Sequence, residues 1–367
     1  MAIRRIAVLG AGHGGCAAAA DLTMRGFEVR LHARRGERIA AIEANGGITA
    51  RGVQDGLAPI AHMTTDVAEA VDGADLIMLV VPSVAHEAYA EALTPLLDTN
   101  TPIFLNPGHT GGGLHFAHAL ARAGFRGTPR ICETVTLTYI SRLEGEATVG
   151  IYGYTKRLMF AALPDRETAA LHALVEPLYP EITPARTVLE TGLSNMNAVF
   201  HPPGMLMNAG WIENTDGGFL FYREGITDAV GRVVSALDAE RVEIARGLGV
   251  KTRSFMETFH AAGLTTDAAL ASGSVARACR ESEPNKTLKS PPSLDHRYVH
   301  EDVGYGLVPM AGFAGLVGVP CPVIDAHIDL LSAAAGIDYR ATGLTLPRLG
   351  LGGMSPAEVR DFVTEGR

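Results

Sequence analysis

The chain of 367 residues has few cysteines and no apolar run long enough to cross a membrane. Its four cysteines lie far apart without a C-x-x-C pair, so neither a disulfide framework nor a zinc site is indicated, and we expect buried thiols. The longest apolar run among the first hundred residues covers only 76–82, and the N-terminus has no apolar stretch ahead of a small-residue cleavage site. We therefore expect a cytoplasmic protein with no membrane segment.

Basic side chains are outnumbered by acidic ones, and lysine is scarce. The formal net charge is −9 and the sequence pI is about 5.8, which argues against nucleic acid or anionic membranes as partners because both require a basic surface. The only lysines are Lys156, Lys251, Lys286 and Lys289. A catalytic lysine is therefore excluded from the long stretch between Lys156 and Lys251.

A glycine-rich loop follows directly on an apolar strand. The apolar pattern of residues 3–9 predicts a strand. Residues 10–15 are Gly-Ala-Gly-His-Gly-Gly, and the alanine-rich sequence that follows predicts a helix. With a second predicted strand over 27–32, this order is the dinucleotide-binding fingerprint of a Rossmann-type fold. Gly10 permits the tight turn, Gly12 lets the backbone approach a pyrophosphate, and Gly15 lets the helix pack against the strand.

The fingerprint predicts a nicotinamide dinucleotide as cofactor. Free N–H groups at the start of the helix would face its phosphates, and its ribose and nicotinamide would pass the carboxyl end of the strand over 76–81. The predicted cofactor-binding residues are Gly10, Gly12, His13, Gly14, Gly15, Val81 and Pro82, together with the two arginines discussed below.

Short apolar strands alternate with helical segments through the first half of the chain. The predicted strands cover residues 3–9, 27–32, 76–81, 102–105 and 130–134. Alternation of this kind predicts a parallel, doubly wound sheet. The length and the apolar fraction of 47% are sufficient for two cores. We predict an α/β protein with a Rossmann-type domain over 1–185 and a mostly α-helical domain over 186–367.

A second glycine-rich segment, Asn106-Pro-Gly-His-Thr-Gly-Gly-Gly113, follows the fourth predicted strand. It is compatible with a second backbone cradle for a ligand and equally with a strand-to-helix turn that binds nothing. His109 within it is open to the same two interpretations.

The residues at the end of the second strand discriminate between NAD(H) and NADP(H). An acidic residue there would hydrogen-bond a free 2′-hydroxyl, whereas an arginine would accept a 2′-phosphate. Glu28 lies at the start of that strand and Glu37 beyond a basic pair, so neither occupies the usual acidic position. Arg34 and Arg35 offer planar donors suited to a phosphate. This favours NADP(H), with NAD(H) as the alternative.

Beyond residue 180, the sequence contains few of the short apolar segments that predict strands. Residues 189–209 and 227–248 predict long helices, the second with apolar residues at helical spacing. That apolar face is compatible with a dimer interface and equally with an internal core. The proline-rich segment 281–294 predicts a loop or lid.

Two segments of the helical part carry side chains suited to catalysis. On the first helix, Asn197 and His201 are four residues apart and hence on one face, and Pro202 and Pro203 predict an end or a kink just beyond. Most histidines on buried helices are structural. Residues 295–309 concentrate charge, aromatic rings and glycine, where Asp302 could orient an imidazole and Arg297 could hold a substrate carboxylate.

At these residues the chain resembles the octopine/nopaline (opine) dehydrogenase family. The resemblance covers nearly the whole chain, and its more specific parts are NAVFHPPGMLMNAG at 197–210 and RYVHEDVGYGLVP at 297–309. It implies that His201 is the acid/base, that Asp302 pairs with it, and that Arg297 binds the carboxylate of a 2-oxo acid. Asn197 and Tyr298 are the further predicted substrate-binding residues. Several members of the family use NADH, and the family implies a homodimer.

The resemblance implies an NAD(P)H-dependent reductive condensation of an amino acid with a 2-oxo acid, and the reverse oxidation. One alternative is a reductase of a simple keto acid or secondary alcohol, which would use the same acid/base pair. Reductases of the ketopantoate or glycerol-phosphate type resemble this architecture but rely on a lysine in the helical part, and no lysine lies between Lys156 and Lys251, so the first helix lacks it. The other alternative is a redox-sensing protein that binds the dinucleotide without turning it over.

Overall fold

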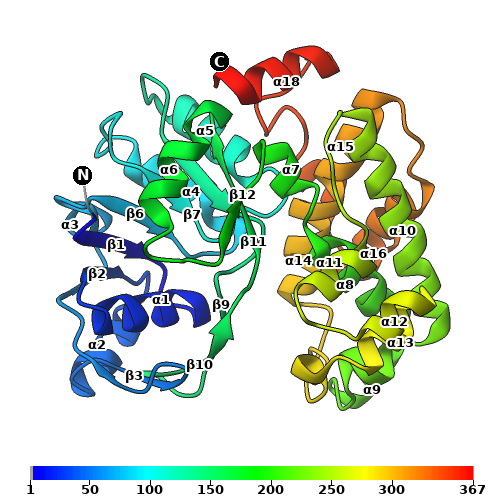
Figure 1. Cartoon of the computed structure of the whole chain (residues 1–367), viewed down its shortest axis with the longest axis horizontal. Coiled ribbons are helices and arrows are strands. Elements are labelled where there is room, and N and C mark those ends of the chain that lie inside the picture. Colours follow the sequence, from blue (N-terminus) through cyan, green and yellow to red (C-terminus); the bar gives the residue numbers. More distant parts are fainter. Residues whose placement is uncertain (1–2, 367) are drawn as a thin grey trace. The chain divides into compact units, whose positions relative to one another are not determined.

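The computed structural model describes residues 3–366, which fold into two compact units. Unit 1 comprises the chain up to Thr191 together with the residues from Asp361 onward, and unit 2 comprises Gly192–Arg360. Figure 1 labels the elements of both. The division falls six residues beyond the expected boundary at 185/186, and the chain returns to unit 1 at its C-terminal end.

Unit 1 is built on an eight-stranded sheet in the order β12-β11-β8-β7-β6-β1-β2-β5. The strands run in parallel from β8 through β5, whereas β11 pairs antiparallel to β8 and β12 follows β11. The predicted Rossmann-type class is confirmed, with this reversed pair as an addition. The strands are β1 (Arg5–Leu9), β2 (Glu28–His32), β5 (His62–Thr64), β6 (Leu76–Leu79), β7 (Ile103–Leu105), β8 (Ile131–Thr134), β11 (Leu158–Leu163) and β12 (Ile182–Pro184).

Helices cover both faces of this sheet. On β1, Ile6 and Val8 belong to the core on one side of the sheet, while Ala7 and Leu9 belong to the core on the other. Such a strand, apolar on both faces, is typical of a doubly wound sheet. The helices of unit 1 are α1 (His13–Met24), α2 (Gly36–Ala44), α3 (Val67–Val71), α4 (His86–Leu93), α5 (Gly112–Ala123), α6 (Thr168–Val175) and α7 (Val188–Gly192).

A second, four-stranded sheet in unit 1 has no counterpart in the sequence-based expectation. Its order is β4-β3-β10-β9, and it contributes Ile48, Val149 and Ile151 to the same core as α1. Its strands are short or interrupted by glycine, which weakens their sequence signal. They are β3 (Ile48–Gly52), β4 (Gly56–Ala58), β9 (Tyr139–Leu143) and β10 (Thr148–Tyr154).

Unit 2 is helical, as predicted. The second predicted long helix is α10 (Asp228–Gly247), which begins after the cap residue Thr227 and buries Val230, Val234, Leu237 and Ile244 within the unit. Its apolar face therefore serves an internal core. The other helices are α8 (Met196–Met207), α9 (Ala209–Thr215), α11 (Phe255–Ala261), α12 (Asp267–Ser272), α13 (Val275–Arg280), α14 (Arg297–Asp302), α15 (Val308–Val317), α16 (Pro322–Ala335) and α17 (Tyr339–Thr342). The last helix, α18 (Pro356–Glu365), begins in unit 2 and ends in unit 1.

The prediction of one continuous helix over 189–209 was wrong. The chain forms α7, breaks, and resumes as α8, because the Asn195 side chain accepts a hydrogen bond from the Asn197 N–H at 3.1 Å and caps a new helix. Pro202 and Pro203 do not end α8, which continues to Met207. Tertiary packing compensates for the N–H donors that they lack, since the helix is buried from Ala198 to Met205.

The proline-rich segment 281–294 is a loop, but it is bonded to the body of unit 2. The Phe221 N–H donates to the Leu288 carbonyl at 2.9 Å, and the Ser290 N–H donates to the Phe219 carbonyl at 2.9 Å. Ser290 and Pro291 are buried. These contacts do not support the lid expected for this segment.

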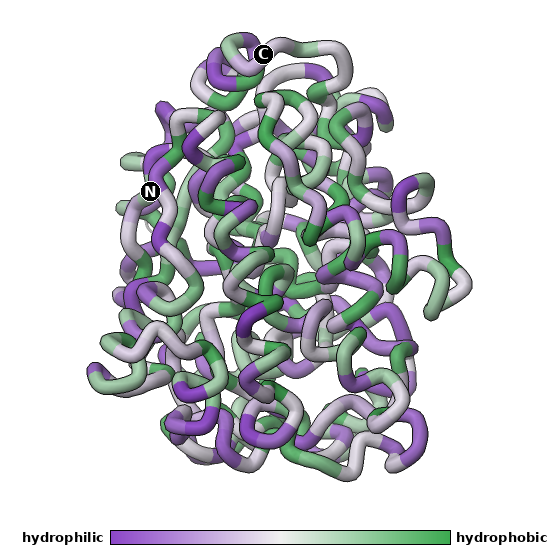
Figure 2. Tube along the Cα trace, turned by 90° about the vertical axis from the view of Figure 1, so that its right-hand side faces the viewer, coloured by the Kyte–Doolittle hydropathy of each residue, from purple (hydrophilic) through white to green (hydrophobic). Residues whose placement is uncertain are grey.

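No helix of the described residues is both long enough and apolar enough to span a bilayer. The hydropathy colouring of Figure 2 accordingly alternates between hydrophilic and hydrophobic stretches along the chain. All four cysteines are free and buried, as expected.

Candidate functional site

The loop between β1 and α1 has the backbone that its glycines predict. Gly10 takes a positive φ of 117°, where a side chain would be strained. A Cβ on Gly15 would lie 1.7 Å from the Gly10 carbonyl oxygen, so only glycine lets α1 pack this closely. A Cβ on Gly14 would lie 2.6 Å from Leu137.

Gly12 differs from these three glycines because nothing lies within 4 Å of a Cβ built on it. It is also the N-cap of α1 and provides no side chain to bond the first N–H groups of the helix. An open space in front of uncapped N–H donors suits the pyrophosphate of a dinucleotide. The residues present therefore fit the predicted cofactor.

His13 is oriented by the second sheet of unit 1. The Leu143 N–H donates to His13 Nδ1 at 2.7 Å, which places the proton of the neutral ring on Nε2. His13 is exposed, so its Nε2–H is available as a hydrogen-bond donor at the glycine-rich loop, where the sequence predicts the cofactor.

Val81 and Pro82 follow directly on β6, which ends at Leu79. A Cβ on Gly10 would lie 2.4 Å from the Val80 carbonyl oxygen and 2.7 Å from Val81 Cγ1. This segment therefore packs against the glycine loop, as the predicted cofactor site requires.

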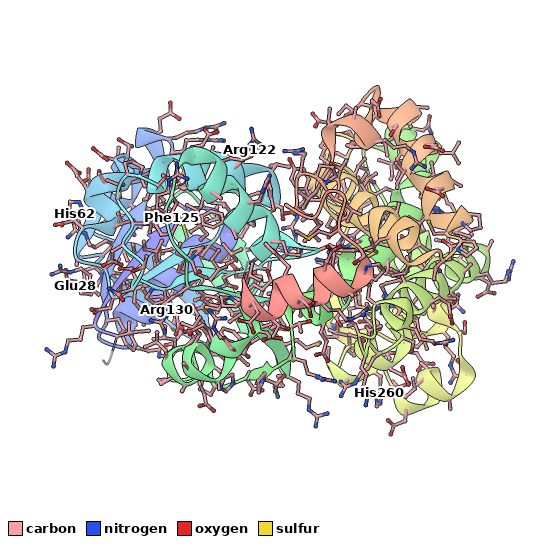
Figure 3. The ribbon with its side chains drawn as sticks, turned by 90° about the horizontal axis from the view of Figure 1, so that it is seen from above. Glu28, His62, Arg122, Phe125, Arg130 and His260 are labelled. Carbon is pink, nitrogen blue, oxygen red and sulfur yellow. The ribbon has the colours of Figure 1, made fainter. Side chains whose placement is uncertain are left out.

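The end of β2 carries the predicted basic pair. Arg34 and Arg35 are exposed just before α2, and neither guanidinium makes a hydrogen bond or ion pair within residues 3–366, although the Arg35 carbonyl accepts from the Arg38 N–H at 3.2 Å. Glu28 lies at the opposite end of β2, where it pairs with Arg5 at 2.6 Å. Figure 3 shows Glu28 and His62 at the outer rim of unit 1. Glu28 is therefore not the residue that would bind a ribose hydroxyl.

The second glycine-rich segment packs as a buried turn. Its Gly113 N–H donates to Glu133 Oε2 at 2.7 Å, and the Gly108 N–H donates to the Thr134 carbonyl at 3.0 Å. His109 is buried and adopts a positive φ of 57°. These bonds within the protein favour the turn interpretation over a ligand cradle.

In unit 2, α8 and α14 bring together two side chains that are 101 residues apart in sequence. His201 Nδ1 lies 2.7 Å from Asp302 Oδ2, and both side chains are at least 95% buried. A carboxylate accepts, so Nδ1–H donates and Nε2 is the nitrogen left for chemistry. The predicted contact between His201 and Asp302 is present.

The ring of Tyr298 covers the His201 imidazole. The two rings are nearly parallel, at 11°, with centroids 3.5 Å apart. Phe221 contacts both rings, at 6.2 Å from His201 and 5.6 Å from Tyr298. A Cβ on Gly204 would lie 2.5 Å from Phe221, so this glycine of α8 lets the aromatic ring approach.

Arg297 begins α14, and its side chain is half-exposed. Its Nε lies 3.4 Å from Glu301 Oε2, and Glu301 is buried. Burial alone would lower the pKa of Arg297, but the charges of Glu301 and Asp302 raise it. The guanidinium is thus a permanent cation on the helix that carries Asp302.

Asn197 lies in the first turn of α8 and is partly buried. Its backbone N–H is used for the helix cap, and its side-chain amide makes no hydrogen bond within the described residues. The amide is thus free to bond a ligand, although the structure gives it no contact with His201.

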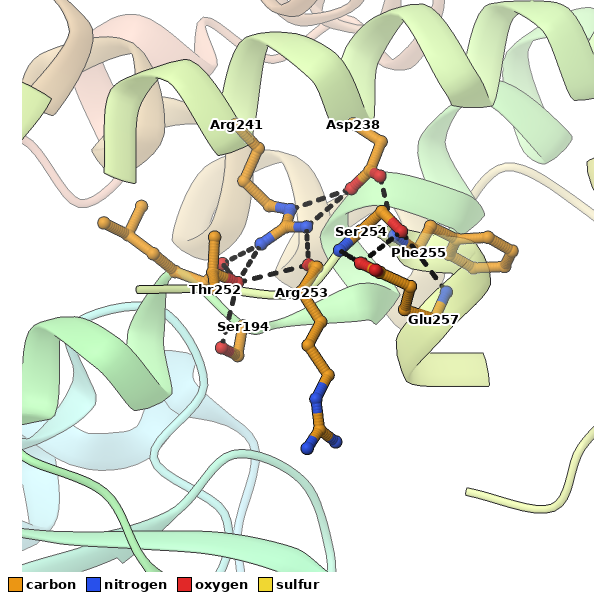
Figure 4. A network of polar contacts seen from close by, with 9 residues as sticks. Ser194, Asp238, Arg241, Thr252, Arg253, Ser254, Phe255 and Glu257 are labelled. Atoms are coloured by element: carbon orange, nitrogen blue, oxygen red, sulfur yellow. Dashed lines mark hydrogen bonds and ion pairs between the residues drawn. The ribbon is translucent and has the colours of Figure 1, made fainter. Parts of the chain in front are cut away.

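Sequence reasoning missed the network that holds the start of α8. Figure 4 shows Arg241 of α10 paired with Asp238 and bonded to Thr252. Arg241 is fully buried and also donates to the Leu193 carbonyl, three residues before α8. The signal was available, because Arg241 continues the apolar spacing of Val234 and Leu237 along α10.

Comparisons with known proteins identify the family of this chain. Residues 184–335 match the family model for the NAD/NADP octopine/nopaline dehydrogenase alpha-helical domain. Residues 5–110 match the NAD-dependent glycerol-3-phosphate dehydrogenase N-terminus. An opine dehydrogenase from Arthrobacter sp. (strain 1C) is 34% identical over 362 residues, covering 97% of this chain and 98% of the relative. This chain belongs to the opine dehydrogenase family.

Solved structures of the family share the fold. An octopine dehydrogenase in complex with NADH and agmatine has a TM-score of 0.80 at 20% identity, covering 99% of this chain and 98% of its own. A yersinopine dehydrogenase with NADP+ bound has a TM-score of 0.72 at 16% identity, again covering 99% and 98%.

Family membership confirms the predicted reaction class. The chain is an NAD(P)-dependent oxidoreductase acting on a CH–NH group, and it carries out the reductive condensation of an amino compound with a 2-oxo acid and the reverse oxidation. The glycerol-3-phosphate dehydrogenase match ends at residue 110 and thus covers only part of unit 1.

Proposed function

We propose that this opine dehydrogenase joins the amine of an amino acid to a 2-oxo acid such as pyruvate through an imine, with His201 as the acid/base and NADPH as the preferred cofactor. The observation that carries this proposal is the buried His201–Asp302 hydrogen bond of 2.7 Å. Bound NAD(P)H supplies the hydride that reduces the imine carbon.

His201 would move the protons of the condensation. The amine adds to the keto carbon, and His201 Nε2 takes a proton from the attacking nitrogen and passes it to the former carbonyl oxygen. Nε2 then moves the second proton of the nitrogen to the resulting hydroxyl, which leaves as water, and the imine remains. In the oxidative direction Nε2 takes the proton from the secondary amine. Asp302 fixes the Nδ1–H tautomer and stabilises the imidazolium. A positioned acid/base of this kind contributes about 10²- to 10⁴-fold to the rate.

Arg297, Tyr298 and Asn197 would hold the substrates. The Arg297 guanidinium matches the carboxylate of the 2-oxo acid, and Glu301 limits its freedom. Tyr298 restricts His201 to one ring orientation through its stacked contact. The side-chain amide of Asn197 would hydrogen-bond an oxygen of the amino acid carboxylate.

The preference for NADPH rests on Arg34 and Arg35, whose guanidinium groups have no partner among the described residues at the position where a 2′-phosphate is read. We expect the Arg34→Ala/Arg35→Ala variant to raise the KM for NADPH about tenfold or more and to leave the KM for NADH unchanged. An unchanged KM for NADPH would overturn the preference.

The reaction is tested by following NADPH oxidation with pyruvate alone, with each of a panel of amino acids alone, and with both together. Dependence on both partners is the expected result. Oxidation with the carbonyl compound alone would indicate a simple reductase, and oxidation with neither would indicate a dinucleotide sensor.

The proposal also includes a homodimer, carried over from the family resemblance, and a location in the cytoplasm, as expected from the sequence. Light scattering on the purified chain would give the mass of the particle, and a mass of one chain would contradict the dimer.

A further inference from the structure

We infer that His296 is a substrate-binding residue whose Nε2–H donates a hydrogen bond to the carboxylate of the 2-oxo acid, beside the Arg297 guanidinium. This inference rests on the proposed function, because it names a further contact to the same substrate. No residue so far assigned provides a neutral donor at this position.

The tautomer of His296 is set by its own helix. His296 is the N-cap of α14, and its Nδ1 accepts a hydrogen bond from the Tyr298 N–H at 3.2 Å. A backbone N–H can only donate, so Nδ1 carries no proton and the neutral ring bears it on Nε2. This is the reverse of His201, whose Nδ1 donates to Asp302.

The location of His296 is beside the proposed acid/base. Its ring packs against the Tyr298 ring in a perpendicular arrangement, with centroids 4.6 Å apart and planes at 88°, while His201 stacks on the face of the same Tyr298 ring. The ring is partly buried, and its Nε2 makes no hydrogen bond within residues 3–366. An N–H that has no partner in the protein can donate to a ligand acceptor.

The charges around His296 keep it neutral. Burial, followed by the positive charges of Arg297 and His201, lowers the pKa of His296 to about 4; Asp302 opposes this shift, and His300 adds to it. The ring therefore remains a donor without charge at neutral pH. It can bind an anion without adding a second positive charge next to His201, which must itself accept a proton.

The carboxylate is the acceptor that the surroundings favour. Arg297 is the next residue in the chain, and its charge acts on the His296 ring. A carboxylate has two oxygens and about four acceptor sites, so it can accept from a guanidinium and a neutral imidazole together. If Arg297 and His296 bind the carboxylate, Nε2 of His201 remains available for the reacting nitrogen and oxygen.

Two substitutions distinguish the helix-capping role of His296 Nδ1 from the proposed hydrogen bond donated by its Nε2–H. In His296→Asn, the side-chain oxygen replaces Nδ1 as the acceptor for the Tyr298 N–H, and the Nε2–H donor is lost. In His296→Gln, the amide NH₂ reaches the position of Nε2, and the cap is lost. The first variant removes only the proposed contact, and the second removes only the structural one.

We expect His296→Asn to melt at the wild-type temperature and to raise the KM for pyruvate about ten- to a hundredfold, with a smaller change in kcat. His296→Gln should melt at a lower temperature and restore the KM to within about threefold of wild type. As a matched control, Thr266→Ala removes the cap of α12 and should lower stability without changing the KM. A wild-type KM in His296→Asn, or an equal rise in both variants, would overturn the inference.

Imidazole ¹⁵N spectra provide a readout that does not need turnover. With NADP+ bound, the Nε2 resonance of His296 should report the protonated nitrogen and should shift on addition of pyruvate. An unshifted resonance at saturating pyruvate would overturn the inference. Failure of the proposed function is a separate result, since the wild-type protein would then oxidise NADPH with no pair of amino acid and 2-oxo acid.

Discussion

In the proposed function, the location of one proton on His201 decides which of its nitrogens meets the substrate. Asp302 accepts from Nδ1, so a neutral His201 presents the lone pair of Nε2 and a protonated His201 presents Nε2–H. Tyr298 stacks on the ring and leaves it little freedom to turn. The pair therefore has both the orientation and the tautomer that an acid/base needs before a substrate arrives.

Asp302→Asn tests the role of this carboxylate. The amide keeps the shape of the side chain but removes the charge that stabilises the imidazolium, so we expect kcat to fall about a hundredfold or more. Asp295→Asn is a matched control, because Asp295 pairs with His300 of α14 at 2.9 Å but is exposed and lies outside the proposed machinery. Equal kcat values in the two variants would contradict the role of Asp302.

Glu133, in unit 1, shows a second effect of burial. It is fully buried in β8 and accepts from Thr191 Oγ1 at 2.5 Å and from the Gly113 N–H at 2.7 Å. Burial raises the pKa of Glu133 from 4.5 to about 7, although both hydrogen bonds lower it. The folded state therefore keeps a proton that the unfolded state releases.

The free energy of unfolding should consequently fall as the pH rises from about 4.5 to about 7. Below this range Glu133 is protonated in both states, and above it the ionised group is buried at a cost of roughly 3 kcal/mol. Glu133→Gln should lack this decrease. Urea unfolding at pH 5 and pH 7.5 measures it, with the exposed Glu91→Gln as control. A wild-type pH dependence in Glu133→Gln would show that Glu133 does not titrate in this way.

At the level of the single helix, α8 and α1 depend on features that local sequence signals describe only in part. The cap residue Asn195 and the internal Pro202 and Pro203 mark the limits of α8, and packing overrides the prolines. Arg241 fixes the segment before α8 through the Leu193 carbonyl and through Thr252. The position of His201 therefore depends on a charge in a different helix.

Arg241→Met should destabilise the protein by about 3–5 kcal/mol, because it leaves Asp238 buried without its partner. Arg246→Met is the matched control on the same helix. Arg246 makes an ion pair with Glu243 at the same i,i+3 spacing, but it is 72% exposed, so its loss should cost about 0.5 kcal/mol or less. Chemical denaturation compares the two, and equal losses would contradict the anchoring role of Arg241.

Gly12→Ala tests the cofactor-binding end of α1. The added methyl group meets no protein atom, and Gly12 has a negative φ, so the fold should be retained. The methyl group would occupy the space assigned to the pyrophosphate, and the Kd for NADPH should rise about tenfold or more.

Fluorescence titration of NADPH measures this affinity. Gly315→Ala, also in open space but within α15 of unit 2, is the control and should leave the Kd unchanged. An unchanged Kd in Gly12→Ala would contradict the assignment of the glycine loop.

For the whole molecule, the sequence predicts the Rossmann-type and helical parts because their signals are local. The glycine loop, the alternation of strands and the apolar spacing of α10 each lie within a short stretch. The small sheet and the reversed β11 depend on pairing between distant residues, which no local pattern reports. The apolar spacing of α10 indicates that Arg241 is buried, but it does not indicate its partners Leu193 and Thr252. His296 was missed for a similar reason, since a histidine beside Arg297 reads as part of a charged turn until its contact with Tyr298 is seen.

The proposed cofactor should also stabilise the folded protein. Ligand that binds only the folded state adds about 2.7 kcal/mol at a concentration of 100 times its Kd. NADPH should therefore raise the melting temperature at a concentration where NADH raises it less. An equal shift with both cofactors at equal concentration would contradict the preference assigned to Arg34 and Arg35.

The most direct test of the central claim is the turnover of His201→Asn, measured with NADPH, pyruvate and the best amino acid of the panel. We predict a kcat at least about a hundredfold below wild type, with the Kd for NADPH unchanged because the cofactor loop lies in unit 1. A kcat equal to that of the wild-type protein would show that His201 is not the acid/base.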